Sequence, residues 1–235
     1  TRTYTLSLHD ALPICDEKAA AKLNTLIDAT NRFNSDNASF AQFQAEGLAK
    51  LKGGFAEGAI TNQPHYDRLQ ADLEKAKKEG STFKEVDAER DNVLNILNEL
   101  VPVYKDLTAY DDSKAYMNDG GAKGKELAAK YVAAVEKFDA AYAKFNETLN
   151  KVNAEQSKKQ IEKLKKDGKK GYAAAMESTL RLTELVDKLE KAPQNADKAA
   201  VEKELSEIEA LLKSINNDRG QVLADRYNSV VGDVR

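Results

Sequence analysis

Apolar residues recur along this chain at intervals of three and four, the spacing of one face of an α-helix. A repeat of seven residues in the middle of the chain is typical of helices that pack side by side in a coiled coil. Its members are Tyr131, Val135, Phe138, Tyr142, Phe145, Leu149 and Val152. No segment shows the alternation of apolar and polar residues that a half-buried strand has. The pattern predicts an all-α fold, an elongated helical bundle with long, coiled-coil-like antiparallel helices.

Glycine and proline residues divide this pattern into successive helices. A first helical segment, Glu17–Leu51, is followed by a glycine-rich loop, a short helix and a third helix that contains Pro102. The third helix ends before Asn118–Gly124, and the long helix with the seven-residue repeat follows it. We expect Asp167–Gly171 to kink or divide that helix, and Ala192–Lys198 to form the turn before the last one, with Asn195 or Asp197 as its cap.

Two further apolar faces are predicted at the ends of the chain. The first segment has one face made of Leu23, Leu26, Ile27, Thr30, Phe33, Phe40 and Phe43. The last helix has one made of Val201, Leu205, Ile208, Leu212 and Ile215. We expect both faces to be buried against neighbouring helices.

The first residues differ from everything that follows. Thr5–Ile14 resembles, residue for residue, the translation of a common short-read sequencing adapter, and its last base would contribute to the codon of Cys15. We therefore interpret residues 1–14 as a non-native prefix without a structural role. The native residue at position 15 was then Cys, Ser, Arg or Gly, and the native leader is expected to be missing. Residues 16–235 are predicted to form a single helical domain that is truncated at the N-terminus, and whether the C-terminus is truncated too stays open.

Composition narrows the function classes. The net charge is −3 and 32% of the residues are charged, a balance unlike that of a nucleic-acid-binding protein, which would be basic. No stretch approaches the 20 or so apolar residues of a membrane-spanning helix. Cys15 is the only cysteine, so no disulfide framework is expected. These features are typical of long, solvated, amphipathic helices.

A resemblance to a known family lies in Tyr104–Phe145. Within it, paired tyrosines and an acidic stretch are followed by Lys-Gly-Lys-x-Leu and a long helix; the matching positions are Tyr110, Tyr116, Asp119, Lys123, Gly124, Lys125 and Leu127. Lys22–Phe33 adds a Leu-Asn-x-x-Ile pattern that leads into Asn-Arg. With these motifs the chain resembles the YiiG-type family of bacterial lipoproteins, a domain of unknown function. The resemblance implies export and lipid attachment at an N-terminal cysteine, and thus the periplasm or the outer face of a bacterial membrane.

Motifs for catalysis are weak. Gly120–Glu126 superficially resembles a phosphate-binding loop, but it follows a helix and ends in Glu where that motif needs Ser or Thr. We interpret it as a turn between helices. His65 is the only histidine outside the prefix, whereas a di-metal helical bundle needs Glu-x-x-His on two helices. We interpret His65 as a surface or capping residue. The sequence predicts no enzyme, no cofactor and no metal site.

One turn between two helices could bind an anion. The helix that begins near Gly124 has free amides and a positive dipole end, which favour an anion. Lys123 and Lys125 add charge, and Tyr110 and Tyr116 offer hydroxyls from the preceding helix. In the alternative, Asp119 or Glu126 satisfies those amides and the lysines only keep the turn soluble.

A basic run, Lys158–Lys170, has three interpretations. It is a solvated helix face, a contact for anionic lipid headgroups or an acidic partner, or the partner of the acidic residues that follow it between Glu184 and Glu209.

Three function classes stay open on the sequence. In the first, the chain is a non-enzymatic cell-envelope lipoprotein domain that acts as a helical scaffold or binding module for an unknown envelope partner. In the second, it is a solute-binding bundle with an anion site near residues 118–125. In the third, it is a cytosolic coiled-coil adaptor. The uncontaminated gene sequence upstream of Asp16 separates the first from the third.

Overall fold

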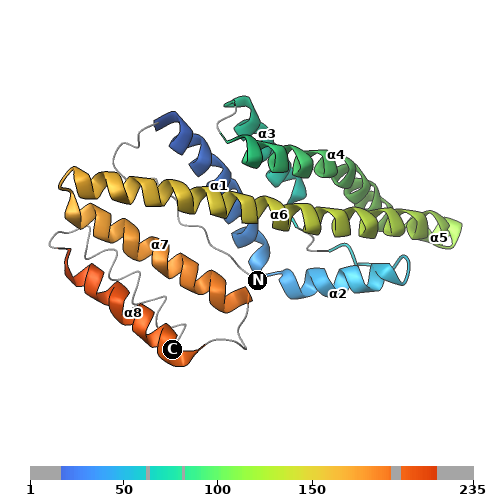
Figure 1. Ribbon diagram of the computed structural model, residues 1–235. Coiled ribbons are helices and arrows are strands. Elements are labelled where there is room, and N and C mark those ends of the chain that lie inside the picture. The colour runs from blue at the N-terminus through green and yellow to red at the C-terminus, as the bar shows by residue number, and fades with distance from the viewer. Residues whose placement is uncertain (1–16, 62–63, 81–82, 192–196, 216–235) are drawn as a thin grey trace. The chain divides into compact units, whose positions relative to one another are not determined.

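The chain is all helical in the part that the computed structural model describes, which is residues 17–61, 64–80, 83–191 and 197–215. No strand occurs in these ranges, and the all-α prediction is confirmed (Figure 1). The helices are α1 Glu17–Ala38, α2 Ala41–Lys52, α3 Tyr66–Lys78, α4 Lys84–Asp112, α5 Tyr116–Asp119, α6 Ala122–Lys166, α7 Lys170–Lys191 and α8 Lys198–Lys213. The prefix 1–14 and Cys15 lie outside the described ranges.

Two compact units make up the described part. The N-terminal unit comprises Lys22–Asn150. The other unit, called here the C-terminal unit, combines the chain from Lys151 onward with the start of α1 up to Ala21. The boundary falls inside α6, which runs for 45 residues, or about 67 Å at 1.5 Å per residue. The prediction of a single domain over residues 16–235 stays a prediction beside this division.

The N-terminal unit is built around the apolar seam of α6. Tyr131, Phe145 and Leu149 are 0% exposed, and Phe138 is 2% exposed. The predicted burial of this seam is therefore confirmed.

Aromatic side chains join the seam to the neighbouring helices. The ring of Phe33 from α1 lies 5.8 Å from that of Phe138 and 5.2 Å from that of Tyr142, both edge to face. Tyr66 from α3 packs 5.1 Å from Phe138 in the same geometry. Edge-to-face pairs add about 0.5–1.5 kcal/mol each to simple burial. This cluster fixes α1 and α3 against α6.

The face predicted for the first segment is wrong beyond Phe33. Phe40 and Phe43 are 40% and 58% exposed, because α1 ends at Ala38 and α2 starts in a new direction at Ala41. The side chain of Asn37 donates to the carbonyl of Phe33 at 2.6 Å, and the N–H of Phe40 bonds to the carbonyl of Asn37 at 3.1 Å. This turn removes the two phenylalanines from the buried face.

The C-terminal unit consists mainly of the end of α6 with α7 and α8. Leu182 and Leu185 of α7 pack with the apolar face of α8, which contains Leu205, Ile208 and Leu212. A second cluster joins Ile161 and Leu164 of α6 to Ala173 of α7. Figure 1 shows α7 between α6 and α8.

Local signals in the C-terminal unit act as the sequence predicts. The chain divides between α6 and α7 at Gly168, whose φ of 72° lies in the left-handed region that favours glycine. Asp197 caps α8 by accepting the N–H of Ala199 at 3.0 Å. Both predictions, the division within Asp167–Gly171 and the cap, are confirmed.

Candidate functional site

The first candidate site is the turn between α4 and α6, where the sequence predicts an anion. Asp119, the last residue of α5, directs its carboxylate at the start of α6. Its Oδ1 accepts the N–H of Gly121 at 2.9 Å and its Oδ2 accepts the N–H of Lys123 at 3.2 Å. The hydroxyl of Tyr110 donates to the same Oδ1 at 2.6 Å. The chain therefore supplies its own anion to this helix end.

Hydrogen bonding changes the acidity of this carboxylate. The Tyr110 hydroxyl, aided by the N–H groups of Lys123 and Gly121, lowers the pKa of Asp119. Each of these donors stabilises the ionised form. Asp119 is consequently held as an anion that caps α6.

Gly124 has a packing role in the same turn. A Cβ at this position would lie 2.4 Å from Cε1 of Tyr110 and 2.6 Å from Cγ of Phe55, closer than carbon atoms approach. The two rings lie 5.1 Å apart, nearly perpendicular at 83°. Only glycine lets both aromatic rings reach the first turn of α6.

The loop after α2 completes the turn. The Tyr116 ring lies 5.3 Å from that of Phe55. The neighbouring Glu57 carboxylate and burial together raise the pKa of Tyr116 to about 12. Gly58 donates its N–H to the carboxylate of Asp111 at 2.9 Å. This loop is thus attached to the turn by ring packing and by the hydrogen bond from Gly58.

The five predicted anion-site residues have separate roles. Tyr110, Tyr116 and Gly124 belong to the packed turn, whereas Lys123 and Lys125 are exposed. The amides of residues 121 and 123 already have a partner in the Asp119 carboxylate. This is the arrangement of the alternative interpretation, in which Asp119 satisfies those amides. Anion binding at the turn stays a prediction, and an anion there competes with Asp119.

Phe55 and Glu57 contribute to the turn although the sequence pattern does not identify them. Their segment contains Gly53, Gly54 and Gly58 and is predicted only as a loop. The available signal is an aromatic residue inside a glycine-rich loop, which needs a hydrophobic partner elsewhere in the fold.

The second candidate site is the basic end of α6. Residues 158–170 contain seven lysines and two acidic residues, a local formal charge of +5 in a chain of net charge −3. Two of the lysines pair with α7: Lys158 with Glu184 and Lys165 with Glu177, each at 2.9 Å. The predicted pairing with the acidic residues between Glu184 and Glu209 therefore holds for Lys158. The partner of Lys165, Glu177, lies before that stretch.

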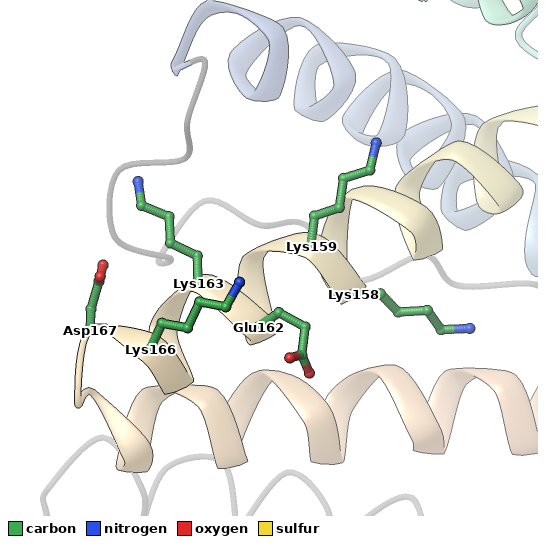
Figure 2. Close-up of a pocket in the computed structure, with 6 residues that line it drawn as sticks. All are labelled: Lys158, Lys159, Glu162, Lys163, Lys166 and Asp167. Carbon is green, nitrogen blue, oxygen red and sulfur yellow. The ribbon is translucent and has the colours of Figure 1, made fainter.

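Lys158 and three further lysines of α6, Lys159, Lys163 and Lys166, border a shallow, open depression of about 500 Å³ (Figure 2). Lys159 and Lys166 are exposed and Lys163 is partly exposed. In the part of the chain that the structure describes, none of these three lysines has an ion pair. Figure 2 shows the side chains of Lys159 and Lys163 leaving α6 on the side away from α7.

His65 and the glycine-rich motif have structural roles. His65 is exposed and occupies the position before α3 without a side-chain cap bond, as expected for a surface or capping residue. Within the glycine-rich motif, Gly120 and Gly121 form the turn from α5 into α6, as expected for a turn between helices, and the rest of it is the start of α6. Within the described ranges, no group of three or more His, Cys, Asp and Glu side chains is placed to hold a metal ion. Over the same ranges, no helix has the length and apolarity needed to span a membrane.

Residues 17–222 match the model of a protein family described as a protein of unknown function (DUF3829). The chain belongs to this family. The match includes both units, both candidate sites and the segment 104–145 that carries the resemblance noted from the sequence. No curated protein and no solved structure matches the chain.

Proposed function

We propose that this chain is the helical scaffold or binding module of a bacterial cell-envelope lipoprotein and that it is not an enzyme. The YiiG-type resemblance of Tyr104–Phe145 supports the proposal; the family that matches residues 17–222 is one of unknown function. The finer assignment, to the YiiG-type lipoproteins, rests on that resemblance alone. This assignment implies that the protein is exported and anchored by lipid at an N-terminal cysteine.

The observation that carries a scaffold role is how the polar groups of the turn are used. Asp119, Tyr110 and Tyr116 bind one another or neighbouring segments, and each interaction holds a helix end or a loop in place. The aromatic residues of the N-terminal unit pack together in the same way. Such groups specify the fold, and the exposed lysines of α6 are then the surface available for recognition.

Lipid attachment is the experiment that tests the cell-envelope assignment. The intact native gene, including the codons upstream of residue 16, is expressed in a bacterium that is fed radiolabelled palmitate. The proposal predicts a labelled protein in the membrane fraction, and substitution of the lipid-accepting cysteine by serine should abolish the label. An unlabelled protein that stays in the cytosolic fraction favours the coiled-coil adaptor instead.

A further inference from the structure

Three lysines near the end of α6 have no ion pair within the described ranges and form one continuous stripe. Lys159, Lys163 and Lys166 are separated by four and three residues, the spacing of one helix face. The opposite face of the same turns contains Ile161 and Leu164, which are buried against α7. The three ammonium groups therefore lie along the outer side of the C-terminal unit.

The stability of α6 explains only part of this charge. A helix favours cations in its last turn, because the dipole is negative there, and this accounts for Lys163 and Lys166. Lys159 lies seven residues before the end of α6, outside the reach of that effect. Lys158 and Lys165 already provide the pairs to α7. Within the described part of the chain, Lys159 thus extends the charged face without an ion pair and outside the last turn of α6.

We propose that this stripe docks onto the anionic phosphate headgroups of a phospholipid bilayer. Basic residues on one helix face are attracted to an anionic membrane surface, with about 1 kcal/mol for each Lys near it. The stripe spans about 10 Å along α6, so its three charges can meet several headgroups at once. This docking deepens the proposed function, since a lipid-anchored protein stays within reach of such a surface.

The residue types of the stripe favour a lipid surface over an acidic protein. Protein interfaces are enriched in arginine and aromatic residues and depleted in lysine. Recognition of a specific carboxylate uses the planar arginine fork, whereas lysine acts as a mobile point charge on a flexible stem. The stripe consists of lysines alone, and the depression beside it is lined by lysines with Glu162 and Asp167. Diffuse attraction to many headgroups fits this composition.

Vesicle sedimentation with the full chain tests the proposal. The probe is vesicles of phosphatidylcholine with about 30% phosphatidylglycerol, compared with pure phosphatidylcholine at about 0.05 M salt. We expect binding to the anionic vesicles only, and weakening as salt rises. The triple variant Lys159→Gln, Lys163→Gln, Lys166→Gln should bind about a hundredfold more weakly.

A matched triple variant separates the stripe from total charge. Lys75 and Lys78 on α3 and Lys105 on α4 are exposed and, within the described ranges, have no ion pair. Their change to glutamine alters the net charge by the same three units. Because these lysines lie outside the stripe, this variant should bind vesicles nearly as well as the native chain. Circular dichroism of both variants checks that the helices are intact.

Three outcomes overturn the proposal: no binding to anionic vesicles, equal loss in the two triple variants, or retention on immobilised polyglutamate without binding to vesicles. The last result assigns the stripe to an acidic polypeptide. Palmitate labelling tests the lipoprotein assignment separately. If the protein is labelled with palmitate but does not bind anionic vesicles, only the docking proposal is refuted. If it binds anionic vesicles but is not labelled, only the lipoprotein assignment is refuted.

Discussion

The side-chain oxygen of Asn37 accepts the main-chain N–H of His65 at 3.2 Å, although the two residues lie 28 positions apart. Asn37 ends α1 and His65 precedes α3. The same side chain donates to the carbonyl of Phe33 at 2.6 Å, and only 9% of Asn37 is exposed. One amide therefore links the end of α1 to the start of α3.

Asn37→Ala should destabilise the N-terminal unit by about 1–3 kcal/mol, because the N–H of His65 loses its partner in a partly buried place. Urea unfolding followed by circular dichroism measures the change. The matched control is Asn118→Ala, since Asn118 is exposed and its amide has no side-chain bond within the described ranges. Equal, small effects of the two substitutions would contradict the linking role.

Phe138→Ala should destabilise strongly, by about 3–5 kcal/mol, as is usual for phenylalanine in a core. Phe138 is 2% exposed and contacts the rings of Phe33, Tyr66 and Tyr142. Lys137→Ala is the control, because that side chain is exposed on the same turn of α6 and has no ion pair in the described part. Lys144 is unsuitable, since it binds Glu89 at 2.7 Å. Thermal melts of the two variants give the comparison.

Gly124→Ala should lower stability although alanine favours helices, because the added methyl meets two rings. Overpacking of this kind costs about 1–3 kcal/mol. In the background Phe55→Ala, one of the two rings is gone and the same substitution should cost less. A double-mutant cycle by urea unfolding measures this difference. An unchanged cost in that background would mean that the clash with Phe55 does not set the requirement for glycine.

The cap at Asp119 predicts a pH dependence. The pKa of Asp119 is lower in the fold than its ordinary value of 3.8, so the unfolded chain binds more protons between those two values. Stability from this carboxylate is thus present above pH 3.8 and is lost as the pH falls through the lowered pKa. The native chain should be more stable than Asp119→Asn near pH 7, and the gap should narrow below pH 3.8.

Urea unfolding of both proteins at several pH values checks this, because the other carboxylates contribute equally and cancel in the difference. A gap that stays constant down to the acid limit would show that the charge of Asp119 does not stabilise the cap.

Anion binding at the turn can be tested against the same cap. Sulfate should shift the amide resonances of Gly121 and Lys123 little in the native chain, because Asp119 already accepts both amides. In Asp119→Ala these amides are free, so larger shifts are expected, and Lys123→Ala with Lys125→Ala should reduce them. Equally small shifts in every variant would end the anion-site hypothesis.

The sequence predicts helices well where apolar residues recur at regular spacing and where a glycine marks a turn. The seven-residue spacing from Tyr131 to Val152 predicts a buried seam in α6, and a glycine at position 168 predicts the division from α7. Each of these signals is local to one helix or one turn. Interactions between residues close together in the sequence are enough to determine these features.

The sequence pattern does not predict features that depend on a contact with a residue far away in the sequence. The end of α1 contains no glycine or proline. The turn there is instead held by the side chain of Asn37, which bonds to Phe33 and to the N–H of His65. Phe40 and Phe43 therefore look like part of the first face although they are exposed. The role of Gly124 depends likewise on Phe55, 69 positions away, and the pattern cannot show that contact.

The uninterrupted course of α6 has a consequence for how the chain unfolds. Because the boundary at Asn150 and Lys151 falls within a helix, no flexible linker isolates one unit from the other. Helix formation is cooperative, so the backbone bonds at this junction are lost only when helix on one side or the other frays. Unfolding of either unit then shortens α6, which also belongs to the other unit. The two units are therefore thermodynamically coupled through the main chain itself.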